Sequence, residues 1–278
     1  MFQPSEALRV ATVILLAGLL ADGALTARHD DAGGAAPAAV RLASVQVAAV
    51  AALSIGAVVL QGDLGPAVLL AGLFVAMLYL AGARQRSLVG ALGVLAAGAL
   101  GVLLVSSRAQ ERVVIWLDPW SSAEGLGYQA LQAIGGLASG DVLGAGPAGG
   151  VPTLIPAAHT DYPFAVIGEE WGLVGTLACL ALYTVLTVRG LQLASGVRGR
   201  GAQLLVAGLA ASIGLQVLVP TAGTLRLIPL TGVTSPFVSY GGSSTLMSWV
   251  VLGLIVRLAQ PPGRAAPRGM ATRDGGAA

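Results

Sequence analysis

Seven long apolar runs dominate the sequence and limit the chain to folds that a lipid bilayer can surround. A helix needs about 20 apolar residues to cross the hydrocarbon core. Runs of about that length lie at residues 8–27, 40–60, 64–82, 87–106, 164–188, 202–220 and 243–258. Only 10% of the 278 residues are charged, too few to cover a water-soluble domain of this size. We therefore expect an all-α polytopic membrane protein with about seven transmembrane helices.

The arginines orient these spans. All 15 basic residues are arginine, and loops that carry arginine tend to stay in the cytoplasm. This rule places the C-terminus in the cytoplasm and leaves four arginines outside: Arg9, Arg108, Arg112 and Arg226. The longest stretch between spans, residues 108–163, then becomes an extracellular loop. Seven spans also put Met1 outside, which suits either a chain that starts outside or one that lacks an odd number of helices at its front.

Polar clusters interrupt the apolar runs, and they are candidates for function because burying polar groups in a bilayer is costly. In QPSEALR, residues 3–9, Pro4 can start a helix that carries Glu6 and Arg9 on one face. These two side chains either form a helix cap with a local ion pair or belong to a site. In QGDLG, Asp63 either caps the next helix or belongs to a site as well.

The third cluster, PAAHTDYPFAVIGEEWG, opens the fifth apolar run. Thr160 or Asp161 could cap that helix, and His159 precedes them. Alternatively, a carboxylate beside an apolar site has a raised pKa and can act as a base. If the helix is regular, Glu169 shares a face with Asp161. Glu169 and Glu170 at membrane depth would need a partner, a proton or a cavity.

The fourth cluster is PLTGVTSPFVSYGGSS, residues 229–244. Its prolines and glycines preclude one continuous helix, so we expect a re-entrant or broken-helix segment near the C-terminus. Glycine lets a backbone approach a ligand closely, and hydroxyl groups can bind phosphate or sugar. The candidate substrate-binding residues of this cluster are Ser239, Tyr240, Gly241, Gly242 and Ser243.

Several other functions lack support in the sequence. The arginines are scattered through short loops, which argues against binding to nucleic acid. His29 and His159 fall on opposite sides of the membrane in this topology, which excludes a histidine zinc centre. Binding of Mg²⁺ by carboxylates remains open. Cys179 is the only cysteine, so no intrachain disulfide can form.

In their order along the chain, these clusters resemble the landmarks of the SEDS family of bacterial cell-shape and division proteins, the RodA/FtsW/SpoVE group. The segments that carry the resemblance are FQPSEALR, LQGDLGPAVLL, WLDPWSSAEGLGYQALQAIGGLASGDVLGAG, IPAAHTDYPFAVIGEEWGLVG and PLTGVTSPFVSYGGSS. The resemblance implies one SEDS-like transmembrane domain over residues 1–258, followed by a disordered cytoplasmic tail at 259–278. Family members typically have ten spans and carry QPSE at the start of the fourth, so it also implies that three helices are missing before Met1.

The resemblance further implies an activity. Members of the family are glycosyltransferases of the bacterial plasma membrane that polymerise lipid II into peptidoglycan with a class B penicillin-binding protein. Asp161 matches the family's proposed catalytic carboxylate, and Glu6 matches a second important acid. Arg9 stands where lysine is common. Asp161 would take the proton from an acceptor hydroxyl in an inverting displacement, while Glu6 positions a cation.

The pyrophosphate leaving group needs positive charge, which Arg9, another outward arginine or a divalent ion such as Mg²⁺ could supply. The candidate site therefore has Asp161 as the catalytic residue, with support from Asp63, Glu169 and Glu170. Its expected substrate-binding residues are Glu6, Arg9, His159, Thr160, Ser239, Tyr240, Gly241, Gly242 and Ser243. Two alternatives stay open: a lipid II flippase or transporter, and a non-catalytic remnant that acts only as a partner subunit.

Overall fold

The computed structural model describes residues 3–21, 36–125 and 127–260, and these residues form helices and no strand. Seven helices coincide with the seven apolar runs: α1 (Pro4–Ala21), α2 (Ala36–Leu60), α3 (Leu64–Leu80), α4 (Gln85–Val105), α7 (Pro163–Gly196), α8 (Arg200–Thr224) and α9 (Gly242–Ala259). Six of the described helices are long and apolar enough to cross a membrane, and α3 is a shorter apolar helix of 17 residues. The all-α polytopic prediction is confirmed. Most of the expected tail lies outside the described residues.

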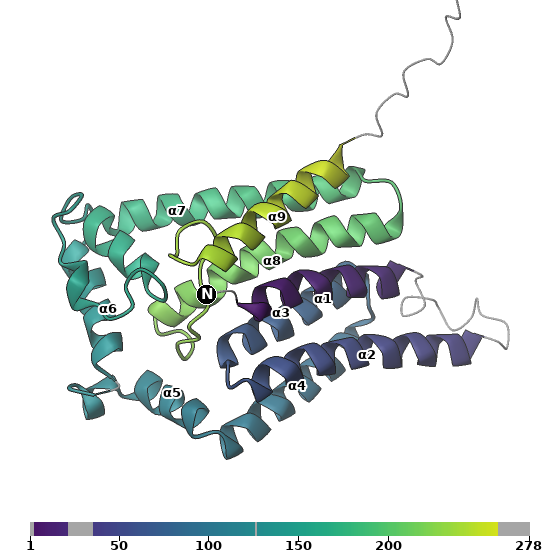
Figure 1. Cartoon of the computed structure of the whole chain (residues 1–278), viewed down its shortest axis with the longest axis horizontal. Helices are drawn as coiled ribbons and strands as arrows, with labels where there is room; N and C mark the ends of the chain where they lie inside the picture. The colour runs from purple at the N-terminus through teal and green to yellow at the C-terminus, as the bar shows by residue number, and fades with distance from the viewer. Residues whose placement is uncertain (1–2, 22–35, 126, 261–278) are drawn as a thin grey trace, which may run out of the picture.

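The expected extracellular loop is largely helical. It contains α5 (Ser107–Leu117), the 3₁₀ turn η1 (Pro119–Ser122), α6 (Tyr128–Gly140) and the 3₁₀ turn η2 (Pro152–Leu154). Side-chain caps explain where two of these elements start, because Ser106 Oγ accepts from Ala109 N (3.4 Å) and Asp118 Oδ1 from Trp120 N (3.1 Å). Figure 1 places α5 and α6 at one end of the bundle, called the α5–α6 end below. Helices α1, α3, α7 and α9 begin toward that end.

Helix α8 lies at the centre of the bundle, in contact with α1, α3, α7 and α9 (Figure 1). Small residues allow this close packing. Gly208 of α8 lies against Met77 of α3, and Gly190 of α7 lies against Ala210 of α8. Close contact between small residues stabilises helix pairs in lipid, where the hydrophobic effect is absent between helices. By contrast, α4 buries none of its residues and lies at the edge of the bundle.

Helix α7 breaks near its start. Gly172 has φ 65° and ψ −166°, a conformation that residues with a side chain rarely adopt. The break removes helical hydrogen bonds on both sides, and the chain after α6 replaces them. Ala145 N donates to Glu169 O (2.9 Å), and Leu173 N donates to Asp141 O (3.0 Å). Helix α7 is therefore irregular at Gly172, and these hydrogen bonds hold the chain after α6 against it.

The contact between α6 and α7 predicts that alanine substitutions at two glycines of α6 will change the free energy of unfolding differently. A Cβ on Gly140 would overlap the carbonyl oxygen of Gly168, whereas a Cβ on Gly135 would meet nothing within 4 Å. We expect Gly140→Ala to lower the free energy of unfolding by about 1–3 kcal/mol. Gly135→Ala should leave it unchanged or raise it by up to about 1 kcal/mol, because alanine favours helix. Thermal unfolding in detergent measures both, and equal effects would contradict the close approach.

Candidate functional site

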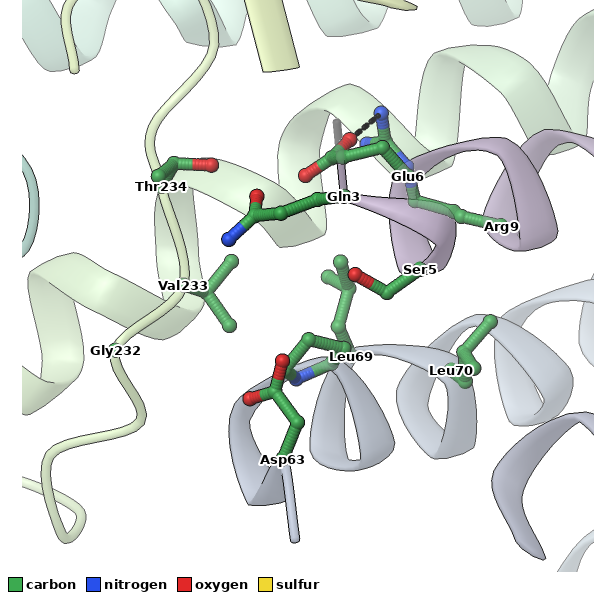
Figure 2. Close-up of a pocket in the computed structure, with 11 residues that line it drawn as sticks. Gln3, Ser5, Glu6, Arg9, Asp63, Leu69, Leu70, Gly232, Val233 and Thr234 are labelled. Carbon is green, nitrogen blue, oxygen red and sulfur yellow. Dashed lines mark hydrogen bonds and ion pairs between the residues drawn. The ribbon is translucent and has the colours of Figure 1, made fainter. Parts of the chain in front are cut away.

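A small pocket lies where α1 and α3 begin, facing the segment between α8 and α9 (Figure 2). Glu6 and Arg9 of α1 line it together with Asp63, so the structure brings together three residues that the sequence analysis singled out. Its volume of about 20 Å³ has room for about one water molecule. The other lining residues are Gln3, Ser5, Pro66, Leu69, Leu70, Gly232, Val233 and Thr234. The QPSE and QGDLG clusters thus belong to one site.

Glu6 and Arg9 form a buried ion pair that extends to α8. Arg9 Nη2 donates to Glu6 Oε2 at 2.9 Å, and the two side chains are 2% and 8% exposed respectively. Arg9 Nη1 donates to Gln216 Oε1, and Gln216 Nε2 donates to Glu6 Oε1 at 3.1 Å. Gln216 is fully buried and lies 3.4 Å from Ser244 Oγ of α9. The local ion pair is therefore confirmed, and it forms part of a network across three helices.

Gln216 was missed as a site residue, although a signal for it was present. It interrupts the sixth apolar run, where a buried amide needs hydrogen-bond partners. The sequence alone does not show that its partners are the two charged groups of α1.

Asp63 is the N-cap residue of α3 by position, but its side chain makes no capping hydrogen bond. The capping interpretation is therefore wrong. Burial raises the pKa of the Asp63 carboxyl, the guanidinium of Arg112 lowers it, and the charge of Asp161 raises it further. Asp63, Arg112 and Asp161 thus lie close enough to influence one another, although they come from three separate segments.

Asp161 lies in a turn that ends before α7 begins. Its backbone N donates to Ala157 O (2.9 Å), and Tyr162 is the N-cap residue of α7. Neither Thr160 nor Asp161 caps the helix, because the cap residue is Tyr162 and makes no side-chain cap bond. The expectation that Asp161 shares a helical face with Glu169 is also wrong, since Asp161 precedes the helix. Its carboxylate is half-buried.

Arg112 of α5 faces the same point as Asp161. A Cβ on Gly232 would lie 3.7 Å from Asp161 Oδ2 and 3.8 Å from Arg112 Nη2. Arg112 Nη1 donates to Thr231 O at 3.0 Å, which holds α5 against the segment between α8 and α9. Gly65 approaches the same carbonyl so closely that a Cβ there would overlap it. The sequence analysis counted Arg112 among the outward arginines without placing it in the site.

The segment between α8 and α9 is irregular, as expected, and it binds the turn that carries Asp161. Tyr240 N donates to His159 O (2.7 Å), and Ser239 Oγ donates to Thr160 O (2.8 Å). Ser243 Oγ accepts from Gln3 N at 3.2 Å. Ser239, Tyr240 and Ser243 therefore join parts of the protein to one another. A direct role for them in binding substrate remains a prediction.

The remaining predicted residues occupy the rim of the site. The rings of His159 and Tyr240 meet edge to face with centroids 5.8 Å apart, and both residues are exposed. Gly241 precedes α9 and Gly242 is its first residue. The contact of these four residues with substrate remains a prediction.

Glu169 supports the outer segment. Its Oε1 accepts from Val151 N at 2.8 Å, and its Oε2 is buried without a hydrogen-bond partner among the described residues. The backbone oxygen of Glu170 accepts from Gly146 N at 3.0 Å. Both glutamates thus help to fix the chain between α6 and α7. No set of three His, Cys, Asp or Glu side chains in the described ranges is grouped to hold a metal ion, so Mg²⁺ remains a prediction.

A large apolar groove of about 1140 Å³ reaches the site from the side. Helices α2, α3, α4 and α5 form its walls, and Ile228–Thr231 complete it. Arg112 lines this groove, and the same arginine faces Asp161 near Gly232. The groove therefore meets the polar site at Arg112. An apolar chain could occupy such a groove while a charged group at its end reaches the site.

These features define a polytopic helical membrane protein with a polar site assembled at one end of its bundle. The chain matches a family model described as "Cell cycle protein", the FtsW/RodA/SpoVE model, over residues 1–262. It belongs to this family, as its motifs indicated.

Two named relatives show how much of a family member the chain represents. It is 41% identical over 219 residues to the "Peptidoglycan glycosyltransferase RodA" of Mycobacterium tuberculosis. The aligned residues cover 78% of this chain and 47% of the relative. It is 38% identical over 264 residues to the "Probable peptidoglycan glycosyltransferase FtsW" of Thiomicrospira cyclica, which covers 92% and 65%. The chain spans about half the length of the mycobacterial relative.

Solved structures show the same fold. One, described as "Structural coordination of polymerization and crosslinking by a peptidoglycan synthase complex", matches with a TM-score of 0.73 and 30% identity, over 93% of this chain and 70% of the other. The rod shape determining protein RodA of Thermus thermophilus matches with a TM-score of 0.59 and 28% identity, over 93% and 64%.

The buried network predicts that Gln216→Leu is strongly destabilising. Leucine keeps the volume but leaves Arg9 and Glu6 without their amide partner. We expect a loss of about 2–4 kcal/mol in the free energy of unfolding. Gln203→Leu is the matched control on α8. Among the described residues the side chain of Gln203 bonds only the Val197 carbonyl, and its loss should cost about 1 kcal/mol. Thermal unfolding of both variants is the measurement, and similar small losses would show that the network does not stabilise the bundle.

Proposed function

We propose that this protein is a peptidoglycan glycosyltransferase that polymerises lipid II into glycan strands, as the names of its relatives suggest. One observation carries the proposal: the half-buried Asp161 carboxylate lies beside Arg112, which also lines a large apolar groove. A lipid-linked sugar has a long apolar chain, a charged pyrophosphate and a reactive sugar in that order. The groove, Arg112 and Asp161 follow in the same order.

The chemistry needs a base and a site for the leaving group. Asp161 takes the proton from the 4-hydroxyl of the acceptor sugar as that oxygen attacks the anomeric carbon of the donor. The bond from this carbon to the pyrophosphate breaks, and its electron pair leaves with the pyrophosphate. A single displacement inverts the anomeric centre. Glu6 and Arg9 are closed into their network with Gln216, so we assign them to positioning α1 beside the site.

The location of the protein follows from its fold and family. It is a multi-pass membrane protein, and we propose the bacterial plasma membrane with the α5–α6 end outside and the C-terminus in the cytoplasm. The C-terminal ends of α3, α7 and α9 lie at the opposite end of the bundle from α5 and α6 (Figure 1), and Arg84, Arg198 and Arg257 belong to these ends. The first solved structure above concerns a complex that coordinates polymerisation with crosslinking. We therefore propose a class B penicillin-binding protein as the partner.

A second function, transport of lipid II, deserves mention because of the groove itself. Its walls are apolar and include α4 at the edge of the bundle, and a flippase would need such a path. A transporter makes no glycosidic bond. Strand formation therefore separates the two functions.

Asp161→Asn tests the base. We expect the purified 278-residue chain to polymerise lipid II and the variant to lose at least about 100-fold in rate, the typical share of a general base. Binding of lipid II should persist, because asparagine keeps the size of the side chain. Gel electrophoresis of the glycan strands gives the rate and length of product.

Asp141→Asn is the matched control for this test. Asp141 is an exposed acid of the same outer region, and asparagine keeps its size and the backbone oxygen that accepts from Leu173 N. We expect it to polymerise normally. An Asp161→Asn protein that fails to bind lipid II but still converts what is bound would contradict the role as base. Absence of strands from the unaltered chain would contradict the proposed function.

The groove makes a prediction of its own. Gly90 of α4 lines it, whereas Gly93 on the same helix does not, and a side chain at either position has space. A tryptophan at Gly90 would occupy the path of the lipid chain. We expect Gly90→Trp to raise the KM for lipid II by about tenfold, the effect of losing about 1.4 kcal/mol of binding, and Gly93→Trp to leave it unchanged. Equal KM values would place the lipid chain elsewhere.

A further inference from the structure

A cation must stabilise the leaving group, and the four outward arginines differ in what already occupies them. Both terminal nitrogens of Arg9 are bonded inside the closed network. Arg226 Nη2 donates to Trp116 O at 2.6 Å, which ties the end of α8 to α5. Arg108 is exposed and lies against Gly62 in the turn before α3. Among the described residues, none of these three arginines comes within 4 Å of a Cβ placed on Gly232, beside Asp161.

Arg112 differs because one of its terminal nitrogens is held by the protein while the other faces the gap beside Asp161. Nη1 holds the Thr231 carbonyl, which fixes the direction of the side chain. Nη2 has no hydrogen-bond partner among the described residues and faces the gap at Gly232. Asp161 Oδ2 faces this gap from the other side, yet the described residues show no ion pair between the two within 4.0 Å. The guanidinium is therefore oriented by the protein and still able to bind an anion.

The surroundings of Arg112 indicate the kind of anion. It lines the apolar groove, so an anion bound there can carry an apolar chain that lies between α2, α3 and α4. It also lies near two carboxylates, Asp63 and Asp161, which would repel an anion unless a cation separated them. A phosphate group at the end of a lipid chain fits both features. Its chain can lie in the groove, and the Arg112 guanidinium can offset the repulsion from the two carboxylates.

The geometry points to Arg112 as the residue that binds the pyrophosphate of the lipid-linked donor, one guanidinium nitrogen held by Thr231 and the other directed at a phosphate oxygen. This inference rests on the proposed function for the identity of its ligand. When the bond to the anomeric carbon breaks, the negative charge that grows on the pyrophosphate oxygen lies at this guanidinium. The proton goes to Asp161 on the opposite side of the gap. Arg112 is thus a catalytic residue that the sequence analysis did not single out.

The test compares two lipids on the unaltered chain and on three variants. The probes are undecaprenyl pyrophosphate and uncharged undecaprenol, each titrated into the purified chain in nanodiscs at low salt. We expect the unaltered chain to prefer the pyrophosphate lipid, and Arg112→Gln to weaken its binding by about tenfold or more while undecaprenol binds as before. Arg112→Lys should recover part of the loss, because lysine keeps the charge but not the planar fork.

Arg108→Gln is the matched control, one helical turn before Arg112 on α5 and also basic. It should bind both lipids as the unaltered chain does. If Arg112→Gln weakens both lipids equally, the residue only holds α5 to the segment between α8 and α9, and the inference is overturned. Unchanged binding of undecaprenyl pyrophosphate by Arg112→Gln overturns it as well.

Polymerisation assays on the same proteins separate this inference from the proposed function. If the unaltered chain makes no strands, but Arg112→Gln lacks the preference for undecaprenyl pyrophosphate that the unaltered chain shows, the function is refuted and the role of Arg112 is supported. A chain that makes strands at the same rate and KM in Arg112→Gln would support the function and refute the role of Arg112.

Discussion

The buried contact between Glu6, Arg9 and Gln216 constrains the rest of the structure. Removing a charged group from water costs several kcal/mol even after the protein relaxes, and the bilayer contains no water that could hydrate the charge again. The charges are therefore tolerable only if each keeps its partners. Because the partners come from α1 and α8, the network fixes how these helices meet, and the contact from Gln216 to Ser244 extends this to α9. The ends of α1 and α9 that border the site depend on it.

The outer part of the site is held mainly by backbone groups. His159 and Thr160 offer carbonyl oxygens to Tyr240 and Ser239, and Thr231 offers its carbonyl to Arg112. This arrangement fixes the turn before α7 without using the Asp161 carboxylate. Residues that looked like ligands for a sugar or a phosphate therefore keep the turn in position, while the acid stays available. A serine-rich and glycine-rich segment can serve either purpose, which explains why composition alone could not assign it.

The sequence was sufficient for features that depend on local pattern. Apolar runs predicted seven helices, and the order of the polar clusters indicated the family. The sequence was not sufficient where contacts between segments far apart along the chain determine the local structure. Nothing in an apolar run shows that Gly172 adopts a positive φ, because the reason lies in the chain after α6. Asp63 and Asp161 both stand where a helix cap is common, and neither caps, since each faces neighbours from other segments. Arg112 and Gln216 became site residues only through such neighbours.

Arg9 and Arg112 differ in how their terminal nitrogens are used. Arg9 is closed within its network and stabilises the bundle, whereas one terminal nitrogen of Arg112 has no hydrogen-bond partner among the described residues. A direct ion pair between Arg112 and Asp161 would occupy the lone pairs of the base and the donors of the cation together. Gly232 stands between them with φ 70°, and the absence of a side chain there leaves a gap that both groups face. In the proposed reaction, a base and a cation on opposite sides of one gap can act on the attacking hydroxyl and on the leaving pyrophosphate, because neither has to release the other first.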